Sequence, residues 1–189
     1  MEIILASASP RRQQLLEQIG LKFKIIISDI EEDNSKDMPP QELAVAHARD
    51  KAFDARKKAA DGDVIIGADT IVVLDGHVFG KPLDRDQAIW MLTALSGREH
   101  KVISGVAVVK DHGIFTGFNI TTVKIRQLSP AQIERYVDSG EPMDKAGAYA
   151  IQGKGALLVE SINGCYNNVV GLPLSTLSDL LHEVGVELL

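Results

Sequence analysis

Hydrophobic positions along the chain gather into six short runs that are rich in isoleucine and valine. Turn residues such as glycine, proline, asparagine and aspartate bound each run, and this pattern predicts β-strands. We therefore expect strands at residues 2–6, 23–28, 64–74, 102–109, 114–126 and 156–162.

Five of the segments between these runs have helical signals. Leu15, Leu16 and Ile19 fall on one side of a helix that would end before Gly20. Asp84 and Gln87 stand in an N-cap and N3 relationship at the start of another. The predicted helices cover residues 10–19, 40–60, 84–95, 130–138 and 173–184.

Turn dipeptides shape the expected topology. Asp75–Gly76 and Asn163–Gly164 are signals for two-residue hairpins, and Asp111–Gly113 is a third turn. Helices and strands alternate early, whereas the middle of the chain is hairpin-like. The sequence therefore predicts an α/β fold with a mixed, partly antiparallel sheet flanked by helices. We find no repeat or linker, so we expect a single domain over residues 1–189.

Composition narrows the class of protein. The 189 residues are 45% hydrophobic and 24% charged, which is ordinary for a globular protein and excludes collagen, coiled coil and disorder. A net charge of -6 argues against binding a nucleic-acid polymer, although a small anion responds only to nearby charges. The single cysteine, Cys165, excludes an internal disulfide. No apolar run is long enough for a membrane span or a signal peptide, so we expect no membrane partner and a cytoplasmic location.

The segment Ser7–Arg12 is the first candidate for chemistry. Ser9 as N-cap and Pro10 at the first helical position make a well-formed helix start, and this could be their whole role. However, Arg11 and Arg12 place two cations where the helix dipole disfavours them. A bound phosphate would reverse that effect, so the alternative is an anion site.

Asp69 is the second candidate, because it interrupts the apolar run 64–73. An ionised carboxylate in such a stretch needs a metal, a cation or hydrogen bonds to compensate its burial. One interpretation is a turn aspartate between two short strands. The other is a metal ligand or general base, with Gly67 allowing a close approach by a ligand or backbone.

Two further segments could contribute charged side chains to a site that contains Asp69. The acidic run Glu31–Asp33 is either a solvated loop or the source of a carboxylate that shares a metal with Asp69. Lys51 lies beside His47 at helical spacing, bordering an alanine stripe. Its ammonium either extends to solvent from a packed edge or binds phosphate.

The remaining polar segments are a turn and a long loop. Gly80-Lys81-Pro82 is not a P-loop and is a weak signal by itself. Loop 139–153 is too polar for a simple connector, and Gln152 could pair with the edge of a base. No activated nucleophile is evident in the chain, and the five histidines lack ligand-like spacing. Cations for phosphates and carboxylates for a metal remain, which favours metal-assisted hydrolysis.

Taken in order, these segments resemble the Maf family of nucleoside triphosphate pyrophosphatases. The similarity rests on LASASPRR, EE at 31–32, VIIGADTIV, GKP, LSG, SGEPMDKAGAYAIQGKGA and ING-Y--VVGLP. It implies a Maf/ITPase-like fold of two lobes around a central cleft. It further implies a cytoplasmic enzyme, a homodimer, that uses Mg²⁺ or Mn²⁺ to split a small nucleoside triphosphate into monophosphate and pyrophosphate.

The resemblance also implies roles for individual residues. Asp69 matches the proposed general base, and Glu32 and Asp69 would hold the metal. The substrate-binding residues would be Ser7, Arg11, Arg12, Lys51, Thr70, Lys81 and Gln152. The triplet ADT resembles the branch that acts on dTTP and UTP rather than the SDQ branch that acts on 7-methyl-GTP. By that analogy, Arg12, Thr70 and Gln152 would set the choice of base.

Two other functions fit the same residues. A nucleotide-binding regulator of cell division with little turnover would keep the phosphate contacts, but the intact Asp69 and Glu32 argue against it. An ordinary phosphomonoesterase would use the same cations and metal on a monophosphate.

Overall fold

The computed structural model describes all residues 1–189, which form two compact units. Unit 1 consists of residues 1–70, 104–119 and 171–189, and unit 2 of residues 71–103 and 120–170. Three long strands contribute residues to both units: β3 (Val64–Leu74), β5 (Glu99–Lys110) and β6 (Gly113–Ile125).

The strands hydrogen-bond in the order β2-β1-β3-β5-β6-β7, with β4 added beside β3. The four short strands are β1 (Ile3–Leu5), β2 (Lys24–Ile25), β4 (His77–Phe79) and β7 (Val159–Asn163). The β1–β2 and β1–β3 pairs are parallel, whereas β3–β4 and β6–β7 are antiparallel. The prediction of a mixed, partly antiparallel sheet with helices is confirmed.

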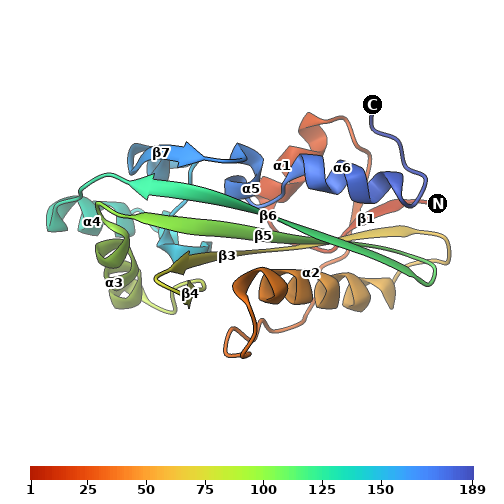
Figure 1. Cartoon of the computed structure of the whole chain (residues 1–189), viewed down its shortest axis with the longest axis horizontal. Coiled ribbons are helices and arrows are strands. Elements are labelled where there is room, and N and C mark those ends of the chain that lie inside the picture. The colour runs from red at the N-terminus through yellow and green to blue at the C-terminus, as the bar shows by residue number, and fades with distance from the viewer. The chain divides into compact units, whose positions relative to one another are not determined.

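Unit 1 places helices on both faces of its strands. Figure 1 shows α2 (Pro40–Arg56) on one face, and α1 (Pro10–Gln18) and α6 (Leu174–His182) on the other. Alanines on α2 pack with Ile4, Ile65 and Val109 of the strands, and these residues form a buried apolar cluster. The alanine stripe predicted from the sequence therefore faces the sheet.

Small residues bring the backbone of α2 very close to the sheet. A Cβ atom added to Gly67 of β3 would overlap the carbonyl oxygen of Ala48, and one added to Gly105 of β5 would overlap the backbone of Ala44. Only glycine leaves room for this approach. The packing fixes the height and rotation of α2, and hence the direction in which its polar side chains leave the helix.

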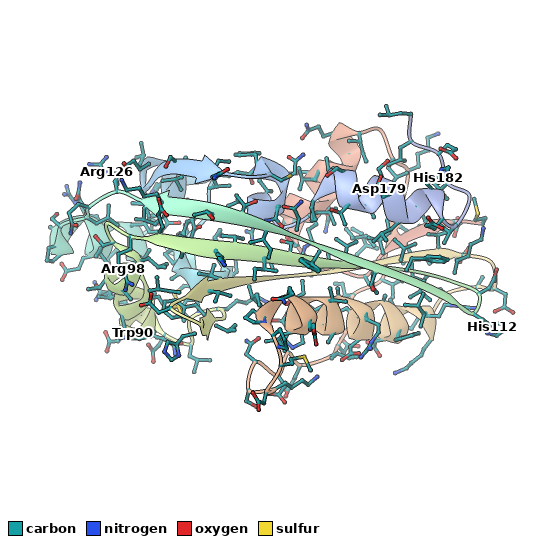
Figure 2. The ribbon with its side chains drawn as sticks, viewed as in Figure 1. Trp90, Arg98, His112, Arg126, Asp179 and His182 are labelled. Carbon is teal, nitrogen blue, oxygen red and sulfur yellow. The ribbon has the colours of Figure 1, made fainter.

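Unit 2 has its own core and its own helices. The helices are α3 (Arg85–Leu95), α4 (Pro130–Val137) and α5 (Tyr166–Val170), with 3₁₀ turns at Glu141–Asp144, Ala146–Ala148 and Gly153–Leu157. The predicted cap is confirmed, because the Asp84 carboxylate accepts a hydrogen bond of 2.8 Å from the Gln87 amide. Trp90 lies at the surface of α3 with its ring 5.2 Å from that of Phe79 (Figure 2).

Two of the three predicted turns join strands as expected. The turns at Asp75–Gly76 and Asp111–Gly113 connect β3 to β4 and β5 to β6, and both aspartates have φ of 50°. His112 marks the second turn in Figure 2. The hairpin predicted at Asn163–Gly164 is wrong, because β7 ends there and α5 begins at Tyr166. Thr121 holds this segment by exchanging hydrogen bonds of 3.0 Å with the backbone of Cys165.

The boundaries of the elements differ by a few residues elsewhere. Helix α2 stops at Arg56 rather than residue 60, and β7 begins at Val159 rather than residue 156. The Glu141 carboxylate accepts a hydrogen bond of 2.9 Å from the Gly155 amide, which draws residues 153–157 into a 3₁₀ turn. No helix in the chain has the combination of length and apolar character that crossing a bilayer requires.

Candidate active site

Asp69 is the centre of a polar cluster in unit 1. It is 3% exposed and lies inside the continuous strand β3, so the alternative of a turn aspartate between two short strands is wrong. Its Oδ1 accepts a hydrogen bond of 2.6 Å from Lys51 Nζ, and its Oδ2 lies 3.1 Å from His47 Nδ1. Both partners come from α2, which the glycine contacts hold against β3.

Lys51 links Asp69 to the acidic segment after β2. Its Nζ also donates a hydrogen bond of 2.6 Å to Glu32 Oε1, so a single ammonium group binds two carboxylates. The Lys51 side chain is only 12% exposed. Because it is paired with both carboxylates, Lys51 does not simply extend to solvent, and the two carboxylates converge on one cation.

The charges around Asp69 decide its ionisation. Burial would raise the pKa of Asp69, but the hydrogen bond from His47 and the charges of Lys51 and Arg12 outweigh it and hold the pKa well below its usual range. In turn, the hydrogen bond to Asp69 raises the pKa of His47 against the opposing effect of burial. Asp69 is therefore ionised at neutral pH, with Lys51 on one oxygen and His47 on the other.

Arg12 organises a second set of contacts in the same unit. Its Nε donates to the Gly171 carbonyl at 2.8 Å, and its two terminal nitrogens donate to Ser7 Oγ and Thr70 Oγ1, each at 3.2 Å. Thr70 Oγ1 also lies 2.7 Å from Ser104 Oγ. Burial lowers the pKa of Arg12, while the charges of Asp69 and Glu32 oppose that effect.

The start of α1 differs in detail from the prediction. Ser9 occupies the N-cap position before Pro10, but its side chain makes no capping hydrogen bond. Instead, Ser7 Oγ accepts a hydrogen bond of 3.2 Å from the Ser9 amide. Arg11 lies on the first turn of the helix, and its charge lowers the pKa of Arg12 slightly in addition to burial.

The structure thus brings together many of the predicted site residues within unit 1. Glu32, Lys51 and Asp69 form one linked group, and Ser7, Arg12 and Thr70 form the other. Lys81 and Gln152 belong to unit 2, where Lys81 follows β4 and Gln152 precedes a 3₁₀ turn. The catalytic, metal-binding and substrate-binding roles assigned to all of these residues stay predictions.

Three contributors to the site were missed by sequence reasoning. His47 was noted only as a neighbour of Lys51, yet its i, i+4 spacing on the same helix was the signal that both would face Asp69. Ser104 and the Gly171 carbonyl gave no signal of their own, because each reaches Thr70 or Arg12 through tertiary packing.

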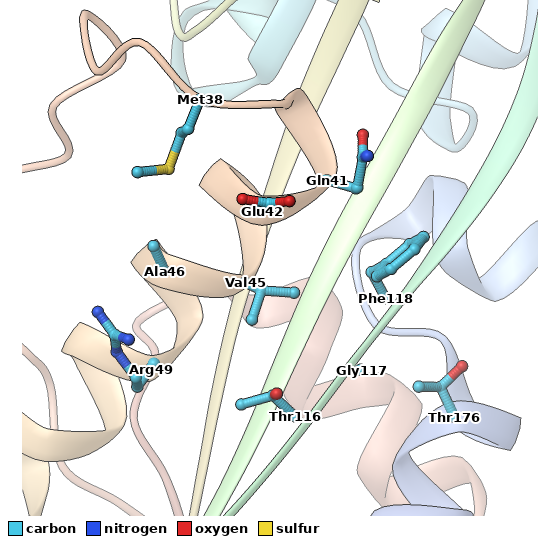
Figure 3. A pocket seen from close by; sticks show the side chains of 10 residues that line it. All are labelled: Met38, Gln41, Glu42, Val45, Ala46, Arg49, Thr116, Gly117, Phe118 and Thr176. Carbon is cyan, nitrogen blue, oxygen red and sulfur yellow. The ribbon is translucent and has the colours of Figure 1, made fainter.

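A separate groove runs along another face of α2, as Figure 3 shows. Its volume is about 660 Å³, and its walls come from α2, β6 and α6, including Val45, Phe118 and Thr176. None of the residues in the two polar groups lines it. The groove is therefore distinct from the cluster around Asp69.

Comparison with known proteins identifies the family. Residues 2–184 match the family described as Maf-like protein. The chain is a member of the Maf family. A dTTP/UTP pyrophosphatase of Acetivibrio thermocellus is 51% identical over 197 residues, which cover 100% of this chain and 98% of that protein. A dTTP/UTP pyrophosphatase of Clostridium botulinum (strain 657 / Type Ba4) is 48% identical over 191 residues and 98% of each chain.

A solved structure supports the fold of this Maf chain. The HAM1 protein from Coxiella burnetii superposes with a TM-score of 0.53 at 20% sequence identity, over 97% of this chain and 99% of that one. At that identity the similarity concerns the fold alone. The resemblance read from the sequence motifs to the Maf family and to a Maf/ITPase-like fold is confirmed.

Proposed function

We propose that this chain is a nucleoside triphosphate pyrophosphatase that hydrolyses dTTP and UTP to the monophosphate and pyrophosphate. The proposal is supported by the names of the similar proteins, which are 48–51% identical over nearly the whole chain. The observation that carries it is the convergence of Glu32 and Asp69 on Lys51 Nζ, with Arg12 beside them. Carboxylates and cations gathered in one group suit a polyanion and a metal.

The donor set fits a divalent metal. Glu32 and Asp69 each present an oxygen 2.6 Å from the same Lys51 nitrogen, so both oxygens lie around one point. Mg²⁺ is commonly bound by one or two carboxylates, with substrate phosphates and water as its other ligands. No third acidic, histidine or cysteine side chain joins them in a metal-binding group. We propose that Glu32 and Asp69 hold Mg²⁺ or Mn²⁺, which would supply charge neutralisation at the phosphates.

Asp69 would have two uses in the reaction. Attack of water at the α-phosphorus forms a new P–O bond and breaks the bond to the oxygen that bridges the α- and β-phosphorus atoms. A carboxylate whose pKa is held this low accepts a proton poorly, so its first use is to orient the water. When a phosphate oxygen draws Lys51 away, Asp69 loses one of its stabilising charges and becomes more basic. Its second use is then to accept the proton that the attacking water releases, while pyrophosphate leaves with the bridging oxygen.

Cations would neutralise the triphosphate, and Arg12 together with two neutral side chains would select the base. We assign Arg11, Arg12, Lys51 and Lys81 to the phosphates, together with the Ser7 hydroxyl. Arg12, Thr70 and Gln152 are assigned to base choice. The fixed contacts of Thr70 with Arg12 and Ser104 support this role, because they orient its hydroxyl. Modified pyrimidine triphosphates, a cytoplasmic location and a homodimer complete the proposal.

The test is hydrolysis of a panel of triphosphates with Mg²⁺, Mn²⁺ or a chelator, carried out in ¹⁸O-labelled water. We expect dTTP and UTP to give labelled monophosphate and unlabelled pyrophosphate, and the chelator to abolish turnover. Label in pyrophosphate would place the attack at the β-phosphorus. Release of orthophosphate and diphosphate would overturn the proposal, and tight binding without turnover would favour a nucleotide-binding regulator.

A further inference from the structure

His47 is a buried histidine with hydrogen-bonding partners on both ring nitrogens. It is 3% exposed and lies on α2, one turn before Lys51. Nδ1 is 3.1 Å from Asp69 Oδ2, and Nε2 is 3.2 Å from the backbone oxygen of Asp33. The ring therefore connects three segments that are distant in sequence: α2, β3 and the acidic segment after β2.

Both partners of the ring are hydrogen-bond acceptors. A carboxylate and a backbone carbonyl have no proton to give, so the ring donates to whichever of them it satisfies. The contact with Asp69 occupies Oδ2 and leaves Oδ1 to Lys51. The orientation of the carboxylate is thus set from both sides, by two residues on one helix.

The contact with Asp33 acts on the segment that carries Glu32. Residues 26–39 contain no helix or strand, and Glu32 lies in an exposed part of this segment. The segment is tied to α2 near one end by the Asp29 amide, which donates to Asp54 Oδ2 at 3.0 Å. The second backbone tie to α2 is His47 to Asp33, immediately after Glu32. Glu32 is therefore held between two ties when it binds Lys51.

We infer that His47 is a positioning residue that fixes the Asp69 carboxylate and, through the Asp33 carbonyl, the backbone that presents Glu32. The inference rests on the proposed function only where it concerns turnover. The placement of the Glu32 segment is a property of the folded chain and is testable without any substrate.

Three substitutions separate the two contacts of His47. His47→Leu replaces the ring by an apolar side chain of similar size and removes both hydrogen bonds. His47→Asn keeps an amide N–H near the position of Nδ1, which preserves the contact with Asp69. His47→Gln extends its amide to the position of Nε2, which preserves the contact with Asp33. His182→Leu is the control, because that exposed ring pairs with Glu187, at 2.7 Å, and lies outside the site (Figure 2).

The readouts are kcat and KM for dTTP, the Mg²⁺ concentration for half-maximal activity, thermal unfolding, and amide hydrogen exchange at residues 30–35. We expect His47→Leu to lower kcat about 10–100-fold, as the loss of partners that orient ligating groups commonly does, with KM nearly unchanged. Exchange at residues 30–35 should rise in the same variant. His47→Gln should lower kcat while exchange stays near the wild-type level. His47→Asn should raise both the exchange and the Mg²⁺ requirement while keeping most of kcat.

Each outcome decides the inference. Unchanged kcat and unchanged exchange in His47→Leu would overturn it, and so would equal behaviour of the Asn and Gln variants. If His47→Leu fails to fold, the Asn and Gln variants still separate the two contacts. If the wild-type chain hydrolyses no triphosphate, the proposed function fails. The exchange of residues 30–35 in the variants then still supports or overturns the positioning role.

Discussion

The buried polar side chains of the two units differ in charge. In unit 2 they are His100, Thr121 and Asn168, and all three contact neutral groups. In unit 1 they include His47 and Asp69, which contact each other and lie beside Lys51. Neutral hydrogen-bonded groups stabilise a core at little electrostatic cost, whereas a buried charge requires an opposite charge or several hydrogen bonds. The buried Asp69 of unit 1 is therefore paired with a cation, and this arrangement could act on a ligand.

The two buried histidines show this difference in one residue type. Both are 3% exposed. His100 Nε2 lies 2.7 Å from the Tyr149 hydroxyl, Nδ1 has no partner, and burial lowers the pKa of His100 to about 4. In His47 the hydrogen bond to Asp69 overcomes burial and raises the pKa. Exposure therefore does not predict the protonation of a histidine, because its partners decide it.

The largest expected effect is that of Asp69→Asn, which removes the charge on which this difference depends. Turnover should fall about 100–1000-fold, because a carboxylate that orients the water and holds the metal is lost. The pKa of His47 should fall, since the hydrogen bond to ionised Asp69 is the largest of the effects that raise it. Steady-state kinetics and NMR titration of the histidine resonances measure the two effects.

Asp63→Asn is the matched control for that substitution. Asp63 is also buried in unit 1, but it accepts hydrogen bonds from the backbone amides of Glu2 at 2.8 Å and Ala60 at 3.1 Å. We expect a lower melting temperature with kcat within about twofold of wild type. Equal losses of turnover in the two variants would show that Asp69 acts only through stability.

The second expected effect is on the pH dependence of stability. It concerns His100, the buried histidine of unit 2, whose partner is neutral. His100 has a pKa of about 4 in the folded chain and an ordinary value of about 6.5 when unfolded. Between these values the unfolded chain binds more protons, so stability falls as the pH is lowered from 6.5 to 4. The contribution of this residue is at most about 3 kcal/mol.

His100→Phe should remove that contribution to the pH dependence. Urea unfolding at pH 4.5 and 7.5 gives the difference in unfolding free energy for each protein, and we expect a smaller difference in the variant. The Tyr149 hydroxyl loses its partner at both pH values, so that loss cancels in the comparison. A difference of the same size in both proteins would mean that His100 is not responsible.

The smallest expected effect concerns Thr70, a neutral group beside the charges of unit 1. Thr70→Val removes the hydroxyl that contacts Arg12 and Ser104. We expect the ratio of kcat/KM between UTP and a purine triphosphate to change about tenfold, because one oriented polar contact is lost. Thr70→Ser should restore the ratio. An unchanged ratio in Thr70→Val would remove Thr70 from base selection.

The sequence predicted the regular elements where local signals were strong. Strand β3 matches its predicted bounds because nearly every residue in Val64–Leu74 is apolar, and α3 begins after the Asp84 cap. The Asn163–Gly164 dipeptide failed as a hairpin signal, because a contact between Thr121 and Cys165 turns the chain into α5. Such a contact joins residues 44 positions apart and leaves no local pattern in the sequence.

The sequence predicted which residues form the site better than it predicted the hydrogen bonds between them. Asp69 was conspicuous because a carboxylate inside an apolar strand needs a partner, and Glu32 was expected to lie near it. That Lys51 would bind both carboxylates, and that His47 would occupy the other oxygen of Asp69, depended on how closely α2 packs on β3. Gly67 was read as permitting a close approach, but not as the contact that sets this distance.

That glycine contact divides the site into a fixed part and an adaptable part. Helix α2 cannot move inward, because its backbone already touches Gly67 and Gly105, and the residues it carries share its rigidity. Any change in shape around Asp69 must therefore come from segments other than α2, such as the chain between β2 and α2. Variants selected for new substrates should therefore leave the alanines of α2 untouched.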